Sequence, residues 1–136
     1  MSKIQYVMDH TAITVSDLDR SVEWYGSKFG FTEEARFDRP DLRKKGAMLR
    51  LGSYGLELFQ PYEPQPLPDH AAEFHRDLEV VGVKHFSLRV PDLEAAQLHL
   101  RGEGETLSDI VNGKTTRYFT LTDPDGISIE IKQPYK

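Results

Sequence analysis

Four ionisable residues recur along this chain in the order His, Glu, His, Glu: His10, Glu57, His85 and Glu130. The interval from histidine to glutamate is 47 residues in the first half and 45 in the second, and the two histidines lie 75 residues apart. Each glutamate stands between two branched apolar residues. Because a strand points successive side chains to opposite faces, each carboxylate faces away from its apolar neighbours. The pattern predicts four ionisable side chains on the polar faces of four strands.

Two neutral imidazoles and two carboxylates offer nitrogen and oxygen ligands with a total charge of about −2, which balances a divalent cation. This ligand type suits one divalent transition metal per site, namely nickel, cobalt, zinc, iron or manganese, better than it suits magnesium or calcium. The chain has no cysteine, so thiolate ligands and thiol nucleophiles are excluded. Taken singly, a histidine in a strand is more often a hydrogen-bonded packing residue than a ligand, and a glutamate beside leucine often just faces solvent. The matching placement of all four favours a metal site.

The elements that must position these side chains are repeated. Residues 8–18 (MDHTAITVSDL) and 83–93 (VKHFSLRVPDL) both place a histidine before alternating residues of a strand, and an Asp-Leu pair at the start of a helix. The halves also end alike, with Glu57-Leu-Phe-Gln-Pro61 against Glu130-Ile-Lys-Gln-Pro134. Each half reads β-α-β-β-β, and the repeat of one supersecondary unit predicts two related sheets.

The expected bounds follow from periodicity and turn residues. In the first half we expect strands at 5–15, 31–37, 47–51 and 56–60, an exposed loop at 39–45, and a helix from Ser16 or Asp17 to Gly30. In the second half we expect strands at 83–90, 106–111, 116–122 and 127–132 and a helix at 93–101. A proline-rich stretch marks a linker, with a short helix at 69–78. We expect one domain, 1–136, made of modules 1–62 and 82–136 joined by a linker at 63–81.

Composition and charge exclude several classes of function. Hydrophobic residues make up 38% of the chain and charged residues 29%, as in an ordinary globular domain. The net charge is −5 and basic residues form no run longer than Arg43-Lys44-Lys45, which argues against nucleic acid or a membrane as partner. The N-terminus lacks the apolar region of a signal peptide, and no apolar run approaches about 18 residues. We expect a cytoplasmic protein whose partner is a small-molecule substrate.

Arg89 is the candidate for binding that substrate. It lies on the predicted strand face that carries His85 and Ser87, and its guanidinium could hold an anionic group of a ligand. A salt bridge at the rim of the site is equally compatible with the sequence.

The order of these motifs resembles the vicinal oxygen chelate superfamily, which includes glyoxalase I, methylmalonyl-CoA epimerase, extradiol dioxygenases and bleomycin-resistance proteins. The resemblance covers nearly the whole chain. It lies in His10-x-x-Ile-x-Val-x-Asp-Leu, in Gly55-Leu-Glu-Leu, in Gly82-Val-x-His85, and in Asp123-Pro-Asp-Gly followed by Glu130. It implies an α+β fold in which two tandem βαβββ modules form a cup-shaped mixed β-sheet, with the helices on the outside, around a divalent metal and commonly in a homodimer.

Within that superfamily the ligand set resembles that of glyoxalase I. The resemblance implies His10, Glu57, His85 and Glu130 as metal ligands, and Glu130 or alternatively Glu57 as catalytic base. The implied activity is that of a lyase or isomerase that stabilises an enediolate of a small oxygenated substrate. A two-His, one-carboxylate set at His10, His85 and Glu130 would instead suit an Fe(II)-dependent extradiol-type dioxygenase. The remaining alternative is a metal-free drug- or small-molecule-binding resistance protein.

The chain departs from glyoxalase I where that enzyme binds glutathione. The arginine expected four residues after the first histidine is Thr14, and the Gln60-Pro61 stretch stands where an asparagine is expected. These differences argue against a glutathione thiohemiacetal as the substrate.

Overall fold

The structure, a computed structural model, describes residues 3–135. The chain divides into two compact units, Met1–Gln65 and Pro66–Lys136, and each unit is described by itself.

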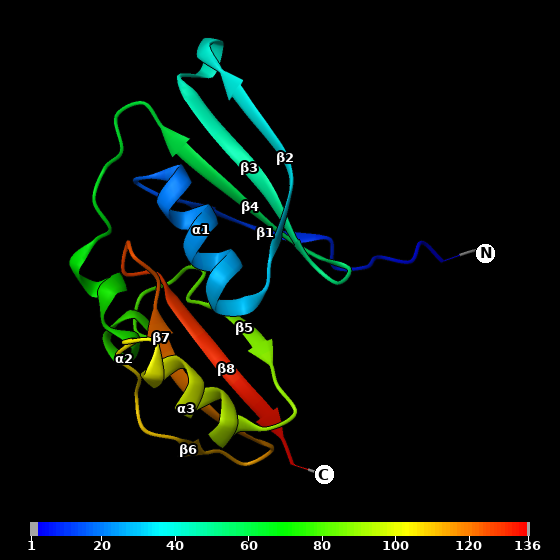
Figure 1. Cartoon of the computed structure of the whole chain (residues 1–136), viewed down its shortest axis with the longest axis vertical. Coiled ribbons are helices and arrows are strands. Elements are labelled where there is room, and N and C mark those ends of the chain that lie inside the picture. Colours follow the sequence, from blue (N-terminus) through cyan, green and yellow to red (C-terminus); the bar gives the residue numbers. More distant parts are fainter. Residues whose placement is uncertain (1–2, 136) are drawn as a thin grey trace. The chain divides into compact units, whose positions relative to one another are not determined.

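The first unit is an open four-stranded mixed sheet with one covering helix (Figure 1). The strand order is β1-β4-β3-β2. Strand β1 runs parallel to β4, and β3 is antiparallel to both of its neighbours. In chain order the elements are β1 (His10–Thr14), α1 (Leu18–Phe29), β2 (Thr32–Arg39), the 3-10 helix η1 (Pro40–Leu42), β3 (Lys44–Leu51) and β4 (Tyr54–Pro61).

The second unit repeats this topology with the strand order β5-β8-β7-β6, again with a parallel first pair. Its elements are the 3-10 helix η2 (Asp69–Ala72), α2 (Phe74–Asp77), β5 (Phe86–Arg89), α3 (Leu93–Gly102), β6 (Val111–Asn112), β7 (Thr116–Thr122) and β8 (Ser128–Pro134). The predicted α+β class, with two tandem βαβββ modules, is confirmed.

Each covering helix begins at an aspartate, as the repeat predicts. The Asp17 carboxylate accepts the Arg20 backbone N–H at 3.1 Å, and the Asp92 carboxylate accepts that of Ala95 at 3.0 Å. These bonds satisfy N–H groups that the first turn of a helix leaves unpaired. Helix α1 ends at Gly30, whose φ of 83° is the left-handed conformation that glycine adopts without a Cβ penalty.

The repeated glutamines hold these helices on their sheets. The Gln60 side-chain oxygen accepts the Leu18 backbone N–H at 2.6 Å, and the Gln133 oxygen accepts that of Leu93 at 2.9 Å. Each bond joins the last strand of a half to the first residue of its helix. The Gln-Pro ending that both halves share therefore fixes the helix against the strand that carries the glutamate.

Each sheet buries one face beneath its helix. Leu18 and Tyr25 of α1, and Leu93 and Leu100 of α3, are at most 3% exposed. The apolar strand residues buried with them are Ala47, Leu49, Leu56 and Leu58 in the first unit and Phe119, Leu121, Ile129 and Ile131 in the second. Since strand side chains alternate, the glutamates lie on the opposite face of each sheet.

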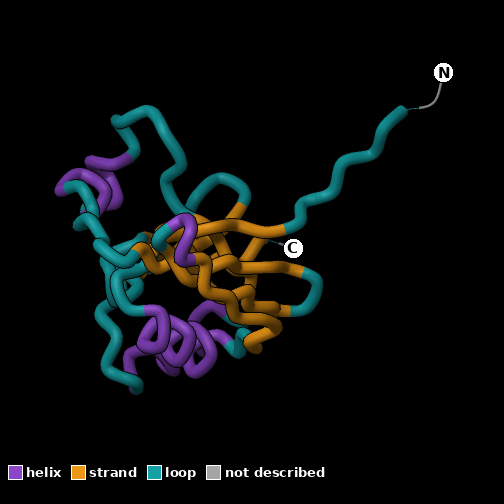
Figure 2. The backbone as a smooth tube through the Cα atoms, turned by 90° about the horizontal axis from the view of Figure 1, so that it is seen from above, coloured by secondary structure: helices purple, strands orange, loops and turns teal. Residues whose placement is uncertain are grey.

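Two predicted strands are shorter than expected, for the same reason. Strand β1 begins at His10, not at residue 5, because His10 pairs with Gly55 and its partner β4 begins at Tyr54. Residues 3–9 have no strand to pair with and form an extended loop (Figure 2). Likewise β5 begins at Phe86, not at residue 83, because β8 begins at Ser128.

Three further expectations about local structure were wrong. The predicted loop at 39–45 includes the end of β2 and the start of β3, which η1 and Arg43 join in a long hairpin. Of the predicted strand at 106–111, only Val111 lies in a strand, β6. Ser108 makes a single backbone hydrogen bond, which its N–H donates to the Thr120 carbonyl oxygen. The predicted helix at 69–78 is broken into η2 and α2. Within residues 3–135, no helix has the length and apolar character needed to cross a membrane.

Candidate functional site

The first predicted pair lies together in the first unit. His10 is on β1 and Glu57 on the adjacent parallel strand β4, where Glu57 pairs with Ala12. His10 and Glu57 are thus diagonal neighbours on one face. The His10 Nε2 atom is 3.5 Å from the Glu57 Oε1 atom, and the two side chains are 36% and 23% exposed.

Asp9 orients the first imidazole. The His10 Nδ1 atom donates a hydrogen bond to the Asp9 carboxylate at 2.7 Å, and this bond lowers the pKa of Asp9. With its proton on Nδ1, the ring presents the Nε2 lone pair toward Glu57. Histidine ligands of metals are commonly fixed by a second hydrogen bond of this kind.

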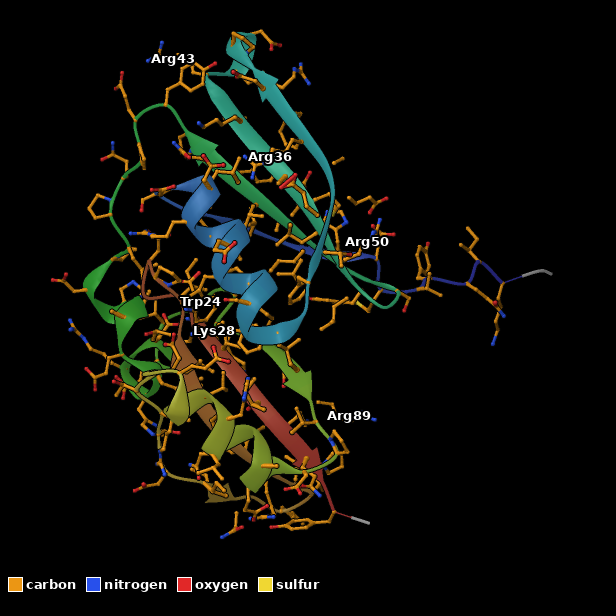
Figure 3. The ribbon with its side chains drawn as sticks, viewed as in Figure 1. Trp24, Lys28, Arg36, Arg43, Arg50 and Arg89 are labelled. Carbon is orange, nitrogen blue, oxygen red and sulfur yellow. The ribbon has the colours of Figure 1, made fainter. Side chains whose placement is uncertain are left out.

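Gly55 leaves the space that the His10 side chain occupies. A Cβ atom at Gly55 would lie 2.9 Å from the His10 Cβ atom and 2.9 Å from Nη1 of Arg50, both shorter than ordinary van der Waals contact. Arg50, labelled in Figure 3, pairs with Gly55 across the β3–β4 hairpin. The glycine therefore permits a histidine and an arginine to flank one backbone position.

The second predicted pair lies together in the second unit. His85 directly precedes β5, and Glu130 lies on β8, paired with Ser87. The His85 Nε2 atom is 3.7 Å from Glu130 Oε2, and the side chains are 23% and 15% exposed. The Ser87 hydroxyl donates to Glu130 Oε1 at 2.9 Å. The second carboxylate thus has one oxygen held by a hydroxyl and the other facing the imidazole.

His85 is supported differently from His10. The ring of Phe74, on α2, packs against its imidazole with 5.2 Å between centroids and 32° between planes. The His85 Nδ1 atom is buried, and no residue within 3–135 hydrogen-bonds to it. Aromatic packing therefore orients the second imidazole.

The pairs fit a divalent metal by ligand type and by spacing. The separations of 3.5 and 3.7 Å exceed those of ordinary hydrogen bonds. They are close to the roughly 3 to 3.5 Å between two ligand atoms that each bind one ion at about 2.1 Å. Each unit supplies one such pair, and among residues 3–135 no group of three or more His, Asp and Glu side chains forms a metal cluster.

Arg89 stands at the end of β5, where its side chain extends away from the strand (Figure 3). It pairs in register with Lys132 of β8. Both lie on the sheet face of Glu130, because each is two residues further along its strand than Ser87 or Glu130. Within the described part of the chain neither cation forms an ion pair, so the rim salt bridge considered from the sequence is not formed here.

The structure adds residues that the sequence reasoning did not assign to the site. Asp9 could have been recognised, since an acidic residue directly before a candidate ligand can reach the imidazole. Ser87 was placed on the correct face, but its partner followed only from the strand register. Phe74 gave no signal, because it lies in a linker without periodicity. Of the other histidines, His99 is 63% exposed and pairs with Glu103, so it lies on the surface.

The fold and its repeated pairs define a tandem βαβββ protein with one candidate His–Glu ligand pair in each half. The family model described as "Glyoxalase/Bleomycin resistance protein/Dioxygenase superfamily" matches residues 7–131. The chain belongs to this superfamily, as its sequence motifs predicted.

Two relatives match along most of their length. The uncharacterized protein YaeR of Escherichia coli (strain K12) is 30% identical over 125 residues, which cover 90% of this chain and 92% of that protein. The uncharacterized protein YwkD of Bacillus subtilis (strain 168) is 32% identical over 130 residues, with the same two coverages.

Solved structures share the fold. A glyoxalase family protein from Enterococcus faecalis is 23% identical with a TM-score of 0.79, covering 93% of this chain and 96% of that one. The trypanothione-dependent glyoxalase I of Leishmania major is 22% identical with a TM-score of 0.73, covering 95% and 87%. TnmS3, an antibiotic binding protein from Streptomyces sp. CB03234, is 19% identical with a TM-score of 0.72, covering 98% and 100%. Enzymes and binding proteins thus share this fold.

Proposed function

We propose that this protein is a divalent-metal-dependent lyase or isomerase of the glyoxalase I type, acting on a small oxygenated substrate in the cytoplasm. The observation that carries the proposal is the repeated pair: in each unit a histidine Nε2 faces a glutamate oxygen on the sheet face opposite the helix, at 3.5 and 3.7 Å. A structural histidine or a solvent-facing glutamate has no reason to recur at the same register of both halves.

In the proposed site, His10 and Glu57 from one unit and His85 and Glu130 from another bind the same ion, which is nickel, cobalt, zinc, iron or manganese. The proposed assembly is a homodimer. A bound metal would supply Lewis-acid stabilisation of the enediolate that forms when a proton leaves the carbon beside a carbonyl group.

Glu130 is the proposed base. Ser87 holds Oε1, and Oε2, on leaving the proposed metal, would take a proton from the substrate carbon. Returning that proton to the neighbouring carbon completes an isomerisation without any further reactant. Arg89 is the proposed partner for an anionic group of the substrate, since it lies on the same face and forms no ion pair with other described residues.

The test is metal content after reconstitution with each candidate ion, followed by elemental analysis. We expect about one equivalent of a transition metal per site in the wild-type protein. His10→Ala and Glu130→Ala should lose it, whereas the control His99→Ala should retain it because His99 is an exposed residue paired with Glu103. A wild-type protein that takes up no metal would contradict the proposal and favour a metal-free binding protein.

Mixing the two inactive variants tests how the pairs combine. If each site joins the first unit of one chain to the second unit of its partner, a mixed dimer of His10→Ala and Glu130→Ala carries one intact site. Random exchange then restores roughly a quarter of the wild-type metal content and activity. No restoration, despite dimer exchange shown by mass spectrometry, places both pairs of a site in one chain. Oxygen uptake with a catechol after Fe(II) loading would instead identify a dioxygenase.

A further inference from the structure

The second unit contains a cavity of about 340 Å³ beside Glu130. Its lining includes Phe74, Thr106, Ser108, Thr120, Thr122 and Ser128. Thr120 pairs in register with Glu130, and Thr122 pairs with Ser128. Paired residues on adjacent strands project from the same face of a sheet, so the floor of the cavity continues the face that carries the proposed base.

The walls of the cavity are fixed by hydrogen bonds on both sides. On one side, the Ser108 hydroxyl oxygen accepts a hydrogen bond from the Thr120 backbone N–H at 2.8 Å, and the Ser108 backbone N–H donates to the Thr120 carbonyl oxygen at 2.9 Å. The other wall is the segment that carries Phe74. There the buried Asp77 carboxylate accepts hydrogen bonds from His70 at 3.0 Å and from Lys84 at 3.2 Å. The cavity is therefore a built feature of the unit.

The hydroxyl groups that line the cavity are available to a ligand. Ser128 is only 6% exposed, yet its hydroxyl makes no hydrogen bond with another residue of the described chain. The side chains of Thr106, Thr120 and Thr122 likewise have no such partner within residues 3–135. The Ser128 hydroxyl oxygen is not among the fully buried unpartnered atoms of residues 3–135, so it opens onto the cavity and keeps its capacity to donate to and accept from a molecule bound there.

The charge of the lining restricts that molecule. Of the described residues that line the cavity, only Glu73 is ionisable, and it is exposed. No cation is present to balance a carboxylate or a phosphate, whereas several hydroxyls can donate to and accept from alcohols. Phe74 offers an apolar surface for carbon-bound hydrogens. These features suit an uncharged group that carries several hydroxyls.

We propose that this cavity is the subsite for an uncharged, polyhydroxylated part of the substrate, such as a short polyol chain. The assignment of this cavity as a substrate subsite next to Glu130 rests on the proposed function. Binding of the polyol part itself does not require the metal. The volume lies near the lower end of the range for small-molecule pockets, about 300 to 1,000 Å³, and holds a chain of a few carbons.

The test is a titration of the metal-free, full-length protein with xylitol, a five-carbon polyol, followed by amide chemical shifts. We expect saturable shifts at the cavity residues and weaker or absent binding of glutarate, a five-carbon dianion. Ser128→Ala removes one hydroxyl and should raise the Kd for xylitol by about three- to tenfold. Thr115→Val is the matched control, because Thr115 is exposed and does not line the cavity; its Kd should equal that of the wild type.

A second variant keeps the test decisive if Ser128→Ala unfolds. Ala72 is an exposed lining residue, so Ala72→Trp should block the cavity and abolish the shifts while the spectrum stays folded. The proposal is overturned if xylitol produces no saturable shifts, if Ser128→Ala binds it as tightly as the wild type does, or if glutarate binds more tightly. Because xylitol binding is measured on metal-free protein, it is independent of metal uptake. If the protein takes up metal but does not bind xylitol, only this inference is contradicted. If it binds xylitol but never takes up metal, only the enzymatic proposal is contradicted.

Discussion

The two halves of the chain place a histidine and a glutamate at equivalent positions but surround them with different chemistry. In the first unit, Glu57 is flanked on its sheet face by Ala12 and Met48. In the second, Glu130 is flanked by the hydroxyl residues Ser87 and Thr120. The two halves share the His–Glu pair, whereas the residues beside the glutamate change from apolar to hydrogen-bonding.

The difference continues along both faces. At the positions equivalent to Arg89 and Lys132, the first unit has Thr14 and Phe59. The Phe59 ring packs edge-on against Phe37, with 6.0 Å between centroids, and Lys44 lies 5.4 Å above it. We propose a division of roles, in which the first unit offers candidate metal ligands with an apolar wall and the second offers candidate metal ligands with groups suited to a polar substrate.

The largest expected effect separates the two glutamates. Because Glu130 lies beside the hydroxyl-lined cavity and Glu57 beside Met48, Glu130→Gln should reduce proton exchange by about 10² to 10⁴-fold. Glu57→Gln should reduce it much less. Exchange of substrate C–H for deuterium, followed by NMR on metal-loaded protein of measured metal content, checks this prediction. Equal losses in the two variants would remove the proposed division between the halves.

An intermediate effect, on metal affinity, is expected from the residue that orients the His10 imidazole, because the two histidines are oriented by different neighbours. Asp9 hydrogen-bonds to His10, but the corresponding residue before His85 is Lys84, whose ammonium group bonds to Asp77 instead. Asp9→Ala should therefore weaken metal affinity by about 10 to 100-fold. Competition with a chelator measures the affinity, and Asp41→Ala, which removes another exposed carboxylate of the same unit, should leave it unchanged. Unaltered affinity in Asp9→Ala would show that its hydrogen bond has no role in the site.

The smallest expected effect is on stability. A Cβ at Gly55 would press on the Cβ atom of His10, which cannot move aside as the end of a flexible side chain does. Gly55→Ala should lower the free energy of unfolding by about 1 to 3 kcal/mol and displace His10. Gly102→Ala is the control, since nothing lies within 4 Å of a Cβ built there. Denaturant unfolding compares the two variants, and equal stability would mean that the first unit relaxes around the added methyl group.

The closeness of histidine and glutamate within each half and the βαβββ repeat could be predicted because they depend on strand alternation and on matching motifs. The ends of the strands could not be predicted, because β1 extends only as far as β4 is present to pair with it. The composition of residues 5–9 alone does not reveal that these residues lack a pairing partner. The cavity wall could not be predicted either, because Phe74 and Asp77 lie in a linker whose structure depends on contacts with Lys84 and His85. Local pattern reveals the elements, but contacts between distant segments complete the site.

The parallel pairing of the first and last strands of each half has a consequence for folding. The hairpins β2–β3–β4 and β7–β8 join neighbouring segments, whereas β1 must close onto β4 from 45 residues away, as in the pair Ile13 and Leu58. Long-range closures of this kind carry a larger loop entropy and tend to form late. We expect the histidine to meet its glutamate at this late step, so that a partly folded half lacks the candidate His–Glu pair. Metal bound to the finished protein should therefore slow unfolding and leave the folding rate unchanged.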